Sequence, residues 1–185
     1  MELGKIVDSL ELFDEEMIIR YPMEKDIEGI LYVHKGWHEE LLFEGDTRPQ
    51  ESDELVKKCL LEDFEGITKN LVVGLIAEID GEVIGYIFIK KGRSSYFHTA
   101  NLHIIAVDRK YRKVGVGERL INGAISEAVK NMQTTRIDLE TNGDNYPAIR
   151  LYQKCGFEIV GRKKNWRYFC GKYVDRVTMV KYNLI

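Results

Sequence analysis

The sequence predicts an α/β domain that is built on a mixed sheet. A hairpin is predicted where Asp80-Gly81 separates two β-rich runs, LVVGLIAEI and EVIGYIFIK, because this dipeptide favours a tight two-residue turn. A strand, a helix and a second strand follow one another between residues 99 and 141, and such a crossover makes its two strands parallel. The length of 185 residues fits a single domain, which we assign to residues 1–185.

The N-terminal part of the chain predicts one strand and two helices. The run EMIIRY (16–21) is typical of a strand, and residues 22–34 predict a helix because their apolar side chains recur near helical spacing. A second helix is predicted over about 52–64. Residues 1–15 are acidic and precede these elements, so we expect an extra leader followed by a core that spans 16–185.

After the hairpin, the remaining elements alternate between strand and helix. The apolar positions of the longest helix form one stripe along its surface, which predicts that this stripe packs on the sheet. The predicted elements are a strand over 99–107, a helix over 117–132, a strand over 135–141, a short helix over 146–155, and two strands across a turn at Gly171-Lys172.

Composition excludes several classes of protein. A formal net charge of −3 argues against general nucleic-acid binding. Three cysteines, Cys59, Cys155 and Cys170, match no zinc or disulfide spacing, which favours reduced thiols in a cytosol. The acidic N-terminus lacks the basic start of a secretory signal, and the apolar runs are too short to cross a bilayer. We therefore expect a soluble, cytoplasmic protein with no membrane partner.

The loop DRKYRKVGVGERL (108–120) predicts an anion site. It places five basic residues and two glycines at the start of the predicted helix, where main-chain N–H groups lack helical partners and the dipole favours an anion. Neither a nucleotide P-loop nor a dinucleotide fingerprint fits, since the chain has no G-x-x-x-x-G-K-[S/T] and Leu120 follows where a third small residue is needed. The pattern that remains is R-x-x-G-x-G (112–117), which favours a phosphate compound.

Two separated motifs resemble the GCN5-related N-acetyltransferases, the acetyl-CoA-dependent GNAT family. They are IIAVDRKYRKVGVGERL (104–120) and IDLETNGDNYPAIRLYQKCGFEIVGRKKN (137–165), and the pattern is nearest to ribosomal-protein alanine acetyltransferases and small-amine acetyltransferases. The resemblance implies a mostly antiparallel sheet of six to seven strands, with helices on both faces. One central parallel pair would be splayed around the cofactor.

The resemblance also implies which residues hold acetyl-CoA. The main chain of one strand would bind the pantetheine and the acetyl carbonyl, and the glycine-containing loop would wrap the pyrophosphate, with charge from Arg112, Lys113 and Arg119. The implied cofactor-binding residues are Ile105, Ala106, Val107, Arg112, Lys113, Val114, Gly115, Val116, Gly117, Glu118 and Asn145.

Asn145 has two compatible roles. Its position before Pro147 and Ala148 predicts a helix N-cap. The resemblance implies in addition that its side-chain amide holds the pantetheine.

Two residues are the implied catalytic groups. The pattern N-x-x-A-x-x-x-Y-x-x-x-G-F runs without a gap from Asn145 to Phe157, and in it Tyr152 donates a proton to the departing thiolate. An amine acceptor is protonated at neutral pH and needs a base, for which we choose Glu140, at the end of the second parallel strand. A buried tyrosine and a surface carboxylate are the structural alternatives. His103 is a second candidate base.

Several features leave alternatives open. His34 and His38 are spaced like zinc ligands, but no third ligand follows, so we predict no metal and assign this helix to the wall of the acceptor pocket. Ten acids within 39–65 predict either a cationic acceptor or a solvated helix face.

The predicted function is acetyl transfer from acetyl-CoA to a primary amine on a small molecule, a protein N-terminus or a lysine, by direct attack in a ternary complex. A non-catalytic acyl-CoA-binding sensor or assembly module is the alternative. Dimers are common in the family, so a homodimer is among the expected states.

Overall fold

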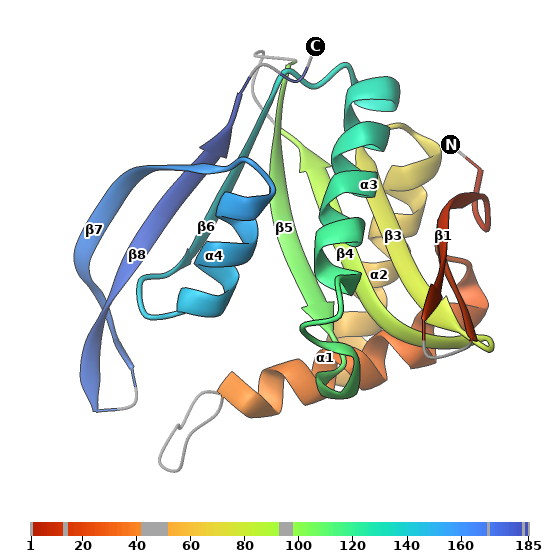
Figure 1. The fold of residues 1–185 in the computed structure, drawn as a ribbon, viewed down its shortest axis with the longest axis horizontal. Helices are drawn as coiled ribbons and strands as arrows, with labels where there is room; N and C mark the ends of the chain where they lie inside the picture. Colours follow the sequence, from red (N-terminus) through yellow and green to blue (C-terminus); the bar gives the residue numbers. More distant parts are fainter. Residues whose placement is uncertain are drawn as a thin grey trace.

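The computed structural model describes residues 2–12, 15–41, 52–92, 98–169, 171–182 and 184 of the chain. These residues form one eight-stranded sheet that is covered by helices (Figure 1). The strands are β1 (Ile6–Leu12), β2 (Glu15–Arg20), β3 (Val72–Ile79), β4 (Glu82–Lys91), β5 (Thr99–Val107), β6 (Arg136–Asn142), β7 (Glu158–Phe169) and β8 (Lys172–Lys181).

The sheet is antiparallel except at one central pair. Its spatial order is β1-β2-β3-β4-β5-β6-β8-β7, and only β5 and β6 are parallel. Their pairing covers three residues of each strand, ending at Asn101 and Asp138. Beyond that point the two strands diverge (Figure 1). The splayed parallel pair that we expected is therefore confirmed.

The number of strands is a correction to the sequence-based prediction. We expected six to seven strands, and the described residues form eight. The additional strand is β1, which lies within the expected leader and pairs antiparallel with β2, from Ile6 opposite Arg20 to Leu12 opposite Glu15. Its acidic, weakly alternating sequence carries little strand signal, so its strand conformation depends on the pairing with β2.

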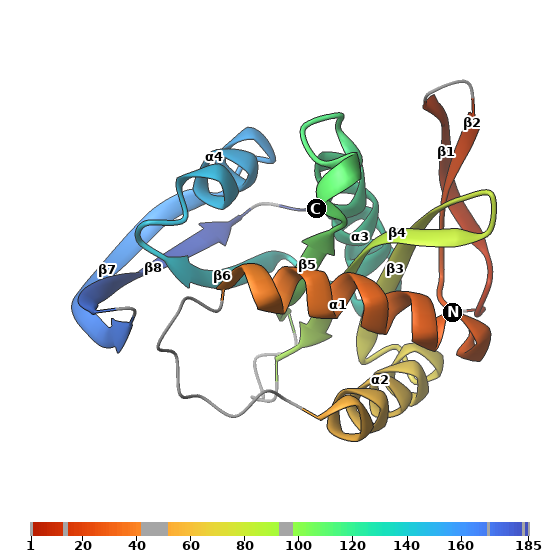
Figure 2. The ribbon, with the colours of Figure 1, turned by 90° about the horizontal axis from the view of Figure 1, so that it is seen from below.

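Helices cover both faces, as expected. Figure 2 shows α1 (Ile27–Leu41) and α2 (Asp53–Thr68) on one face, and α3 (Val116–Met132) and α4 (Tyr146–Lys154) on the other. The predicted apolar stripe of α3 is buried against the sheet. Its fully or nearly buried residues include Leu120, Ile121, Ala124, Ile125 and Ala128. Short 3-10 turns, η1 (Glu24–Asp26) and η2 (Arg109–Tyr111), precede α1 and α3.

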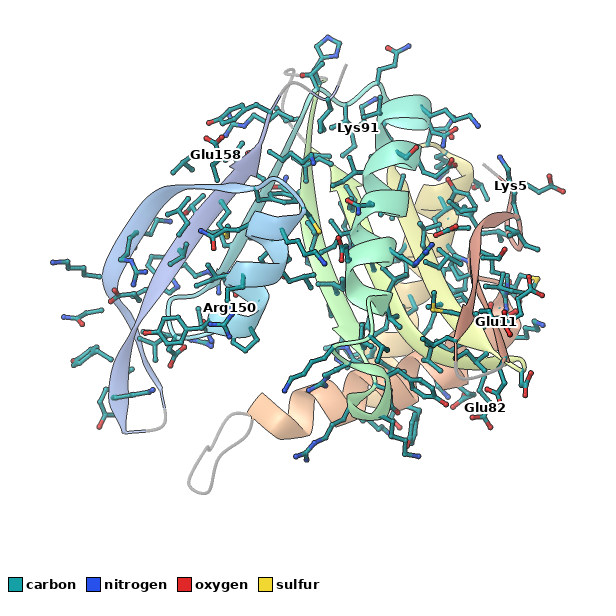
Figure 3. All side chains as sticks on the ribbon, in the orientation of Figure 1. Lys5, Glu11, Glu82, Lys91, Arg150 and Glu158 are labelled. Atoms are coloured by element: carbon teal, nitrogen blue, oxygen red, sulfur yellow. The ribbon has the colours of Figure 1, made fainter. Side chains whose placement is uncertain are left out.

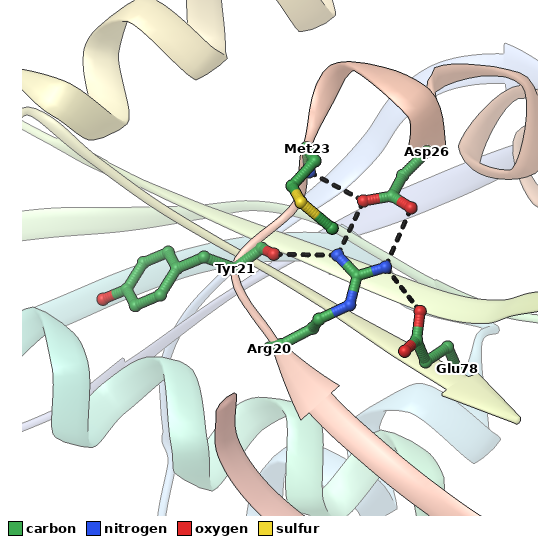
Figure 4. A network of polar contacts seen from close by, with 5 residues as sticks. All are labelled: Arg20, Tyr21, Met23, Asp26 and Glu78. Atoms are coloured by element: carbon green, nitrogen blue, oxygen red, sulfur yellow. Dashed lines mark hydrogen bonds and ion pairs between the residues drawn. The ribbon is translucent and has the colours of Figure 1, made fainter. Parts of the chain in front are cut away.

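A buried ion pair fixes the start of α1 against the sheet (Figure 4). The guanidinium of Arg20, on β2, donates to both carboxylate oxygens of Asp26 at 2.7 and 2.9 Å, and it also contacts Glu78 on β3. The main-chain N–H of Met23 donates to Asp26 as well, at 2.7 Å. Both Arg20 and Asp26 are 4% exposed. Because α1 forms one wall of the region beside the split, this network helps to position the site.

Among the described helices, none combines the length and the apolar character that a membrane crossing would need.

Candidate active site

The split between β5 and β6 exposes the main chain of β5. Residues after Asn101 pair with β4 on one side, while their β6 side has no ladder partner. The N–H of Asp108 donates to the carbonyl of Ile84, and hydrogen-bonding direction alternates along a strand. The main-chain groups of Ile105 and Val107 therefore point toward the split, where an extended ligand such as pantetheine can pair with them.

The start of α3 provides a set of main-chain donors. Helical hydrogen bonding begins where the N–H of Arg119 donates to the carbonyl of Gly115 at 3.1 Å. The N–H groups of residues 116–118 lie in the first turn, where no helical carbonyl can accept from them. Lys113 and Gly115 have positive φ values of 66° and 97°, and such left-handed residues curve successive N–H groups inward. The loop thus has the form of an anion site.

The two glycines of the loop do different things. A Cβ on Gly115 would meet no atom within 4 Å, so the space beside it is open to a ligand. A Cβ on Gly117 would lie 3.1 Å from a methyl group of Leu151, which belongs to α4. Gly117 therefore allows α3 and α4 to approach closely. An ion pair between Glu118 and Lys154, at 2.5 Å, links the same two helices.

Two of the five basic side chains of the loop are engaged within the protein, and those of Arg109 and Lys110 are exposed. The Nε of Arg112 donates to the carbonyl of Val107 at 2.8 Å. Arg119 forms an ion pair with Asp8 of β1 at 2.6 Å. Lys113 is exposed. In this structure the anion site is therefore built chiefly from main-chain groups, with Lys113 as an exposed cation.

Asn145 caps α4, as the sequence predicts. Its side-chain oxygen accepts from the N–H of Ala148 at 3.3 Å, and Pro147 sits in the first turn. Because the oxygen makes this bond, the amide NH2 can donate elsewhere, so capping leaves the side chain able to donate to a pantetheine carbonyl.

Tyr152 is buried on α4 beside the split. It is 7% exposed, and its ring meets that of Phe157 edge to face, with centroids 6.0 Å apart. Burial raises the pKa of the Tyr152 phenol to about 12. The hydroxyl therefore stays protonated over the physiological range and can act as a donor.

Glu140 lies on the opposite face of the sheet from α4. Lys181 donates to the main-chain carbonyl of Cys155 at the end of α4, so its side chain marks the α4 face of β8. Ile137 of β6 lies opposite Lys181 in the sheet, and residues alternate between faces along a strand. Glu140, three residues on, therefore projects from the α1 face of the sheet.

Three side chains surround the carboxylate of Glu140. The Nε of Arg176 donates to it at 3.2 Å, and the Nζ of Lys163 and the hydroxyl of Thr178 donate at 3.4 Å. We call these four residues the Glu140 cluster. Burial raises the pKa of Glu140, but the hydrogen bonds and charges of Arg176 and Lys163 outweigh burial, so the pKa lies below its ordinary value. Sequence reasoning missed these cations, although their positions in the closing hairpin are visible in the strand alternation.

The histidine candidates lie in different surroundings. His103 is exposed and is the extra residue in β5 where the register with β4 shifts. The Nδ1 of His34, on α1, is 2.6 Å from the hydroxyl of Tyr86 on β4, so this hydrogen bond ties α1 to the sheet. The side chain of His38 lies outside the described residues, and no metal-binding group occurs among the residues that are described.

The acidic stretch over 39–65 is only partly described. Where side chains are described, some pair with lysines of neighbouring elements, as Asp53 does with Lys35 of α1 and Asp63 with Lys90 of β4. The side chains of Glu39, Glu40, Glu44, Asp46 and Glu51 lie outside the described residues. A pocket does border α1, the β3–β4 turn and η2, but its lining includes neither Glu140 nor Tyr152.

Comparison with known proteins decides the family. The profile of the acetyltransferase (GNAT) family matches residues 33–157. The chain belongs to this family. A curated relative, the L-amino acid N-acetyltransferase AaaT of Escherichia coli, is 32% identical over 90% of this chain and 98% of its own length. An N-alpha-acetyltransferase of Sulfolobus acidocaldarius is 35% identical over 49% of this chain and 59% of its own length.

Solved structures share the fold. The yncA acetyltransferase of Salmonella typhimurium, solved with acetyl-CoA, superimposes with a TM-score of 0.75 at 21% identity, over 90% of this chain and 93% of that one. The ribosomal-protein-S5-alanine acetyltransferase of Vibrio fischeri gives 0.75 at 21% identity, over 95% of this chain and 97% of that one.

The protein is therefore an acetyl-CoA-dependent N-acetyltransferase that acts on an amine. The described residues fit this cosubstrate, because they provide open space at Gly115, main-chain donors at the start of α3 and an edge of β5 that β6 leaves without a ladder partner. The comparisons lend no support to the non-catalytic alternative.

Proposed function

We propose that the protein acetylates the α-amino group of its acceptor by direct attack, with Glu140 as the base and Tyr152 as the acid. One observation carries this proposal. Glu140 projects from the α1 face of β6, and Tyr152 belongs to α4, which covers the opposite face of the sheet. An amine can thus approach from one side of a thioester in the split while the thiol departs on the other.

Each residue has a defined task in this scheme. Glu140, directly or through a water molecule, takes a proton from the acceptor ammonium, because only the neutral amine has a lone pair with which to attack. The amine nitrogen then bonds to the acetyl carbon, the carbon–sulfur bond breaks, and the second proton that the nitrogen loses passes to the departing sulfur, so that the free thiol is released. Main-chain N–H groups of β5 that face the split stabilise the negative charge that develops on the carbonyl oxygen. Acetyl-CoA supplies the activated acetyl group.

The effect of Tyr152 is expected to be moderate. A phenol whose pKa is about 12 transfers its proton unfavourably to a thiolate, because a thiol has a pKa near 8.5. The main contribution is then a hydrogen bond from the hydroxyl to the sulfur as charge develops there. The thiolate also leaves readily without help, so the loss of this donor slows the reaction without stopping it.

The α-amino group is supported by the relatives. The names of AaaT and of the archaeal relative refer to acetylation of an amino acid and at an α-amino group, respectively. The matches to ribosomal-protein alanine acetyltransferases point to the same kind of amine.

The test is an acetyl-transfer assay with a panel of amines. Both the release of free thiol and the formation of the acetylated product are measured. Tyr152→Phe, which keeps the ring and its packing against Phe157, should lower kcat roughly ten- to a hundredfold with acetyl-CoA affinity nearly intact. Phe157→Leu, which disturbs the same contact without removing a hydroxyl, is the control for packing. A Tyr152→Phe enzyme with unchanged kcat would exclude the acid role.

The homodimer stays a prediction, which light scattering in solution can test.

A further inference from the structure

The Glu140 cluster contains more positive than negative charge. Lys163 and Arg176 both contact the one carboxylate of Glu140. Arg167 lies on the same face, because it is opposite Val174, two residues from Arg176 along β8, and its guanidinium donates to the side-chain oxygen of Asn142 at 3.2 Å. Among the described residues, Lys163 and Arg176 thus place two cations against the one carboxylate of Glu140, with Arg167 nearby on the same face. Figure 3 shows how densely side chains project from β7 and β8.

The contacts within the cluster are long and can be opened. Donor–acceptor distances of 3.2 to 3.4 Å lie at the far end of the hydrogen-bonding range. Arg176 reaches Glu140 through Nε, and its two terminal nitrogens have no partner among the described residues. A guanidinium binds a carboxylate through two parallel hydrogen bonds, so Arg176 retains donors for a second carboxylate.

A basic group directly beside a carboxylate matches an α-amino acid. In such a molecule the ammonium and the carboxylate are attached to the same carbon, so their binding partners must be neighbours in the site. Glu140 and Arg176 are in contact, and both lie on the α1 face. A polyamine would be repelled by the excess of positive charge, and a peptide N-terminus has a neutral amide where the amino acid has its carboxylate.

We infer that the acceptor is a free α-amino acid, whose carboxylate binds Arg176 with support from Lys163 while its amino group faces Glu140. This inference rests on the proposed function, which assigns Glu140 to the amine. The ligand inserts into the existing ion pair, so that each of its charges meets the protein charge of opposite sign.

Binding of the amino acid between Arg176 and Glu140 also makes Glu140 a stronger base. In the free protein, Arg176 and Lys163 hold the pKa of Glu140 low against the opposing effect of burial, which makes the carboxylate a weak proton acceptor. When the acceptor carboxylate engages Arg176, part of that positive charge is neutralised, and Glu140 becomes more basic beside the amine. An amine without a carboxylate would not produce this change.

The experiment compares L-amino acids with their carboxamides, which keep the amine and the side chain but lack the negative charge. For the wild-type protein and for Arg176→Gln, kcat/KM is measured with each acid and its amide at saturating acetyl-CoA. The change in the acid-to-amide ratio on mutation is the readout, because the different pKa values of the two amines cancel in it. We expect Arg176→Gln to lower this ratio about 10- to 100-fold, or roughly 1.4 to 2.8 kcal/mol, mainly through KM for the acid.

Two further variants complete the test. Arg162→Gln is the matched control, because Arg162 lies on the other face of β7 and pairs with Asp175 instead. It should leave the ratio unchanged. Lys163→Gln should also lower the acid-to-amide ratio, by a smaller factor than Arg176→Gln. It provides the test of the carboxylate site if the Arg176 variant does not fold.

The outcomes separate this inference from the proposed function. Wild-type protein that acetylates amides or peptide N-termini as well as the free acids, or a ratio that neither Arg176→Gln nor Lys163→Gln changes, would overturn the amino-acid assignment and leave the proposed function standing. A wild-type protein that acetylates no α-amine of any kind would overturn both.

Discussion

Replacing Gly115 with alanine tests the anion site most directly. Gly115 has a φ of 97°, and a Cβ there would meet no protein atom within 4 Å. The added methyl group therefore projects into the space that we assign to the phosphates of acetyl-CoA. Separately, the left-handed conformation destabilises any residue with a Cβ by roughly 1–2 kcal/mol. Two effects are thus expected, one on folding and one on binding.

Gly81→Ala separates these two effects. Gly81 has a φ of 80° in the β3–β4 turn, and a Cβ there would also meet no atom within 4 Å. Both variants should lose a similar free energy of unfolding, about 1–2 kcal/mol. Only Gly115→Ala should bind acetyl-CoA at least tenfold more weakly, which corresponds to about 1.4 kcal/mol.

Calorimetric titration and thermal unfolding measure both quantities. Acetyl-CoA at about 100 times the wild-type Kd should stabilise the wild-type protein and Gly81→Ala by about 2.7 kcal/mol, and Gly115→Ala by about half as much, because the same concentration is only ten times its Kd. NAD should stabilise all three proteins far less. The reasoning is refuted if folded Gly115→Ala binds acetyl-CoA as tightly as the wild type, or if both glycine variants lose the same affinity.

Two further predictions concern charge. Glu140→Gln should slow acetyl transfer most near neutral pH and least near pH 10, because above its own pKa of about 8 to 10 the acceptor amine no longer needs a base. A mutant-to-wild-type rate ratio that stays flat from about pH 6 to 10 would count against Glu140 as the base and favour His103. Asp26→Asn should lower the free energy of unfolding by about 3 kcal/mol at pH 7, at the lower end for a broken buried pair because Glu78 still faces Arg20. Burial raises the pKa of Asp26, but the hydrogen bonds from Arg20 and Met23 outweigh it and leave the pKa low, so this contribution is present above about pH 4 and lost as the pH falls further. Urea unfolding at several pH values measures it, and equal stability of the two proteins at pH 7 would contradict the assignment.

Features that depend on a few consecutive residues were predictable from the sequence. The Asp80-Gly81 turn follows from local chemistry, and both residues do have positive φ values, of 50° and 80°. The cap at Asn145 involves a partner only three residues away. The loop before α3 is likewise local, since a left-handed glycine and the donors of a first helical turn lie next to each other in the chain. These signals do not depend on how the strands are arranged.

Features that depend on strand register were decided only by the tertiary structure. Arg119 meets Asp8, which is 111 residues away, and this pairing exists only because β1 adds to the edge of the sheet. The Glu140 cluster draws one side chain from β6, one from β7 and two from β8, so it depends on the relative offset of three strands. A shift of one residue in the β6–β8 pairing would move both cations to the α4 face, and the same shift in the β7–β8 pairing would move Lys163 alone. The sequence alone determined the local elements and the motifs at the split. The partners of the charged side chains beside the split depend on the register of the strands, because contacts between distant residues are selected by the packing of the whole sheet.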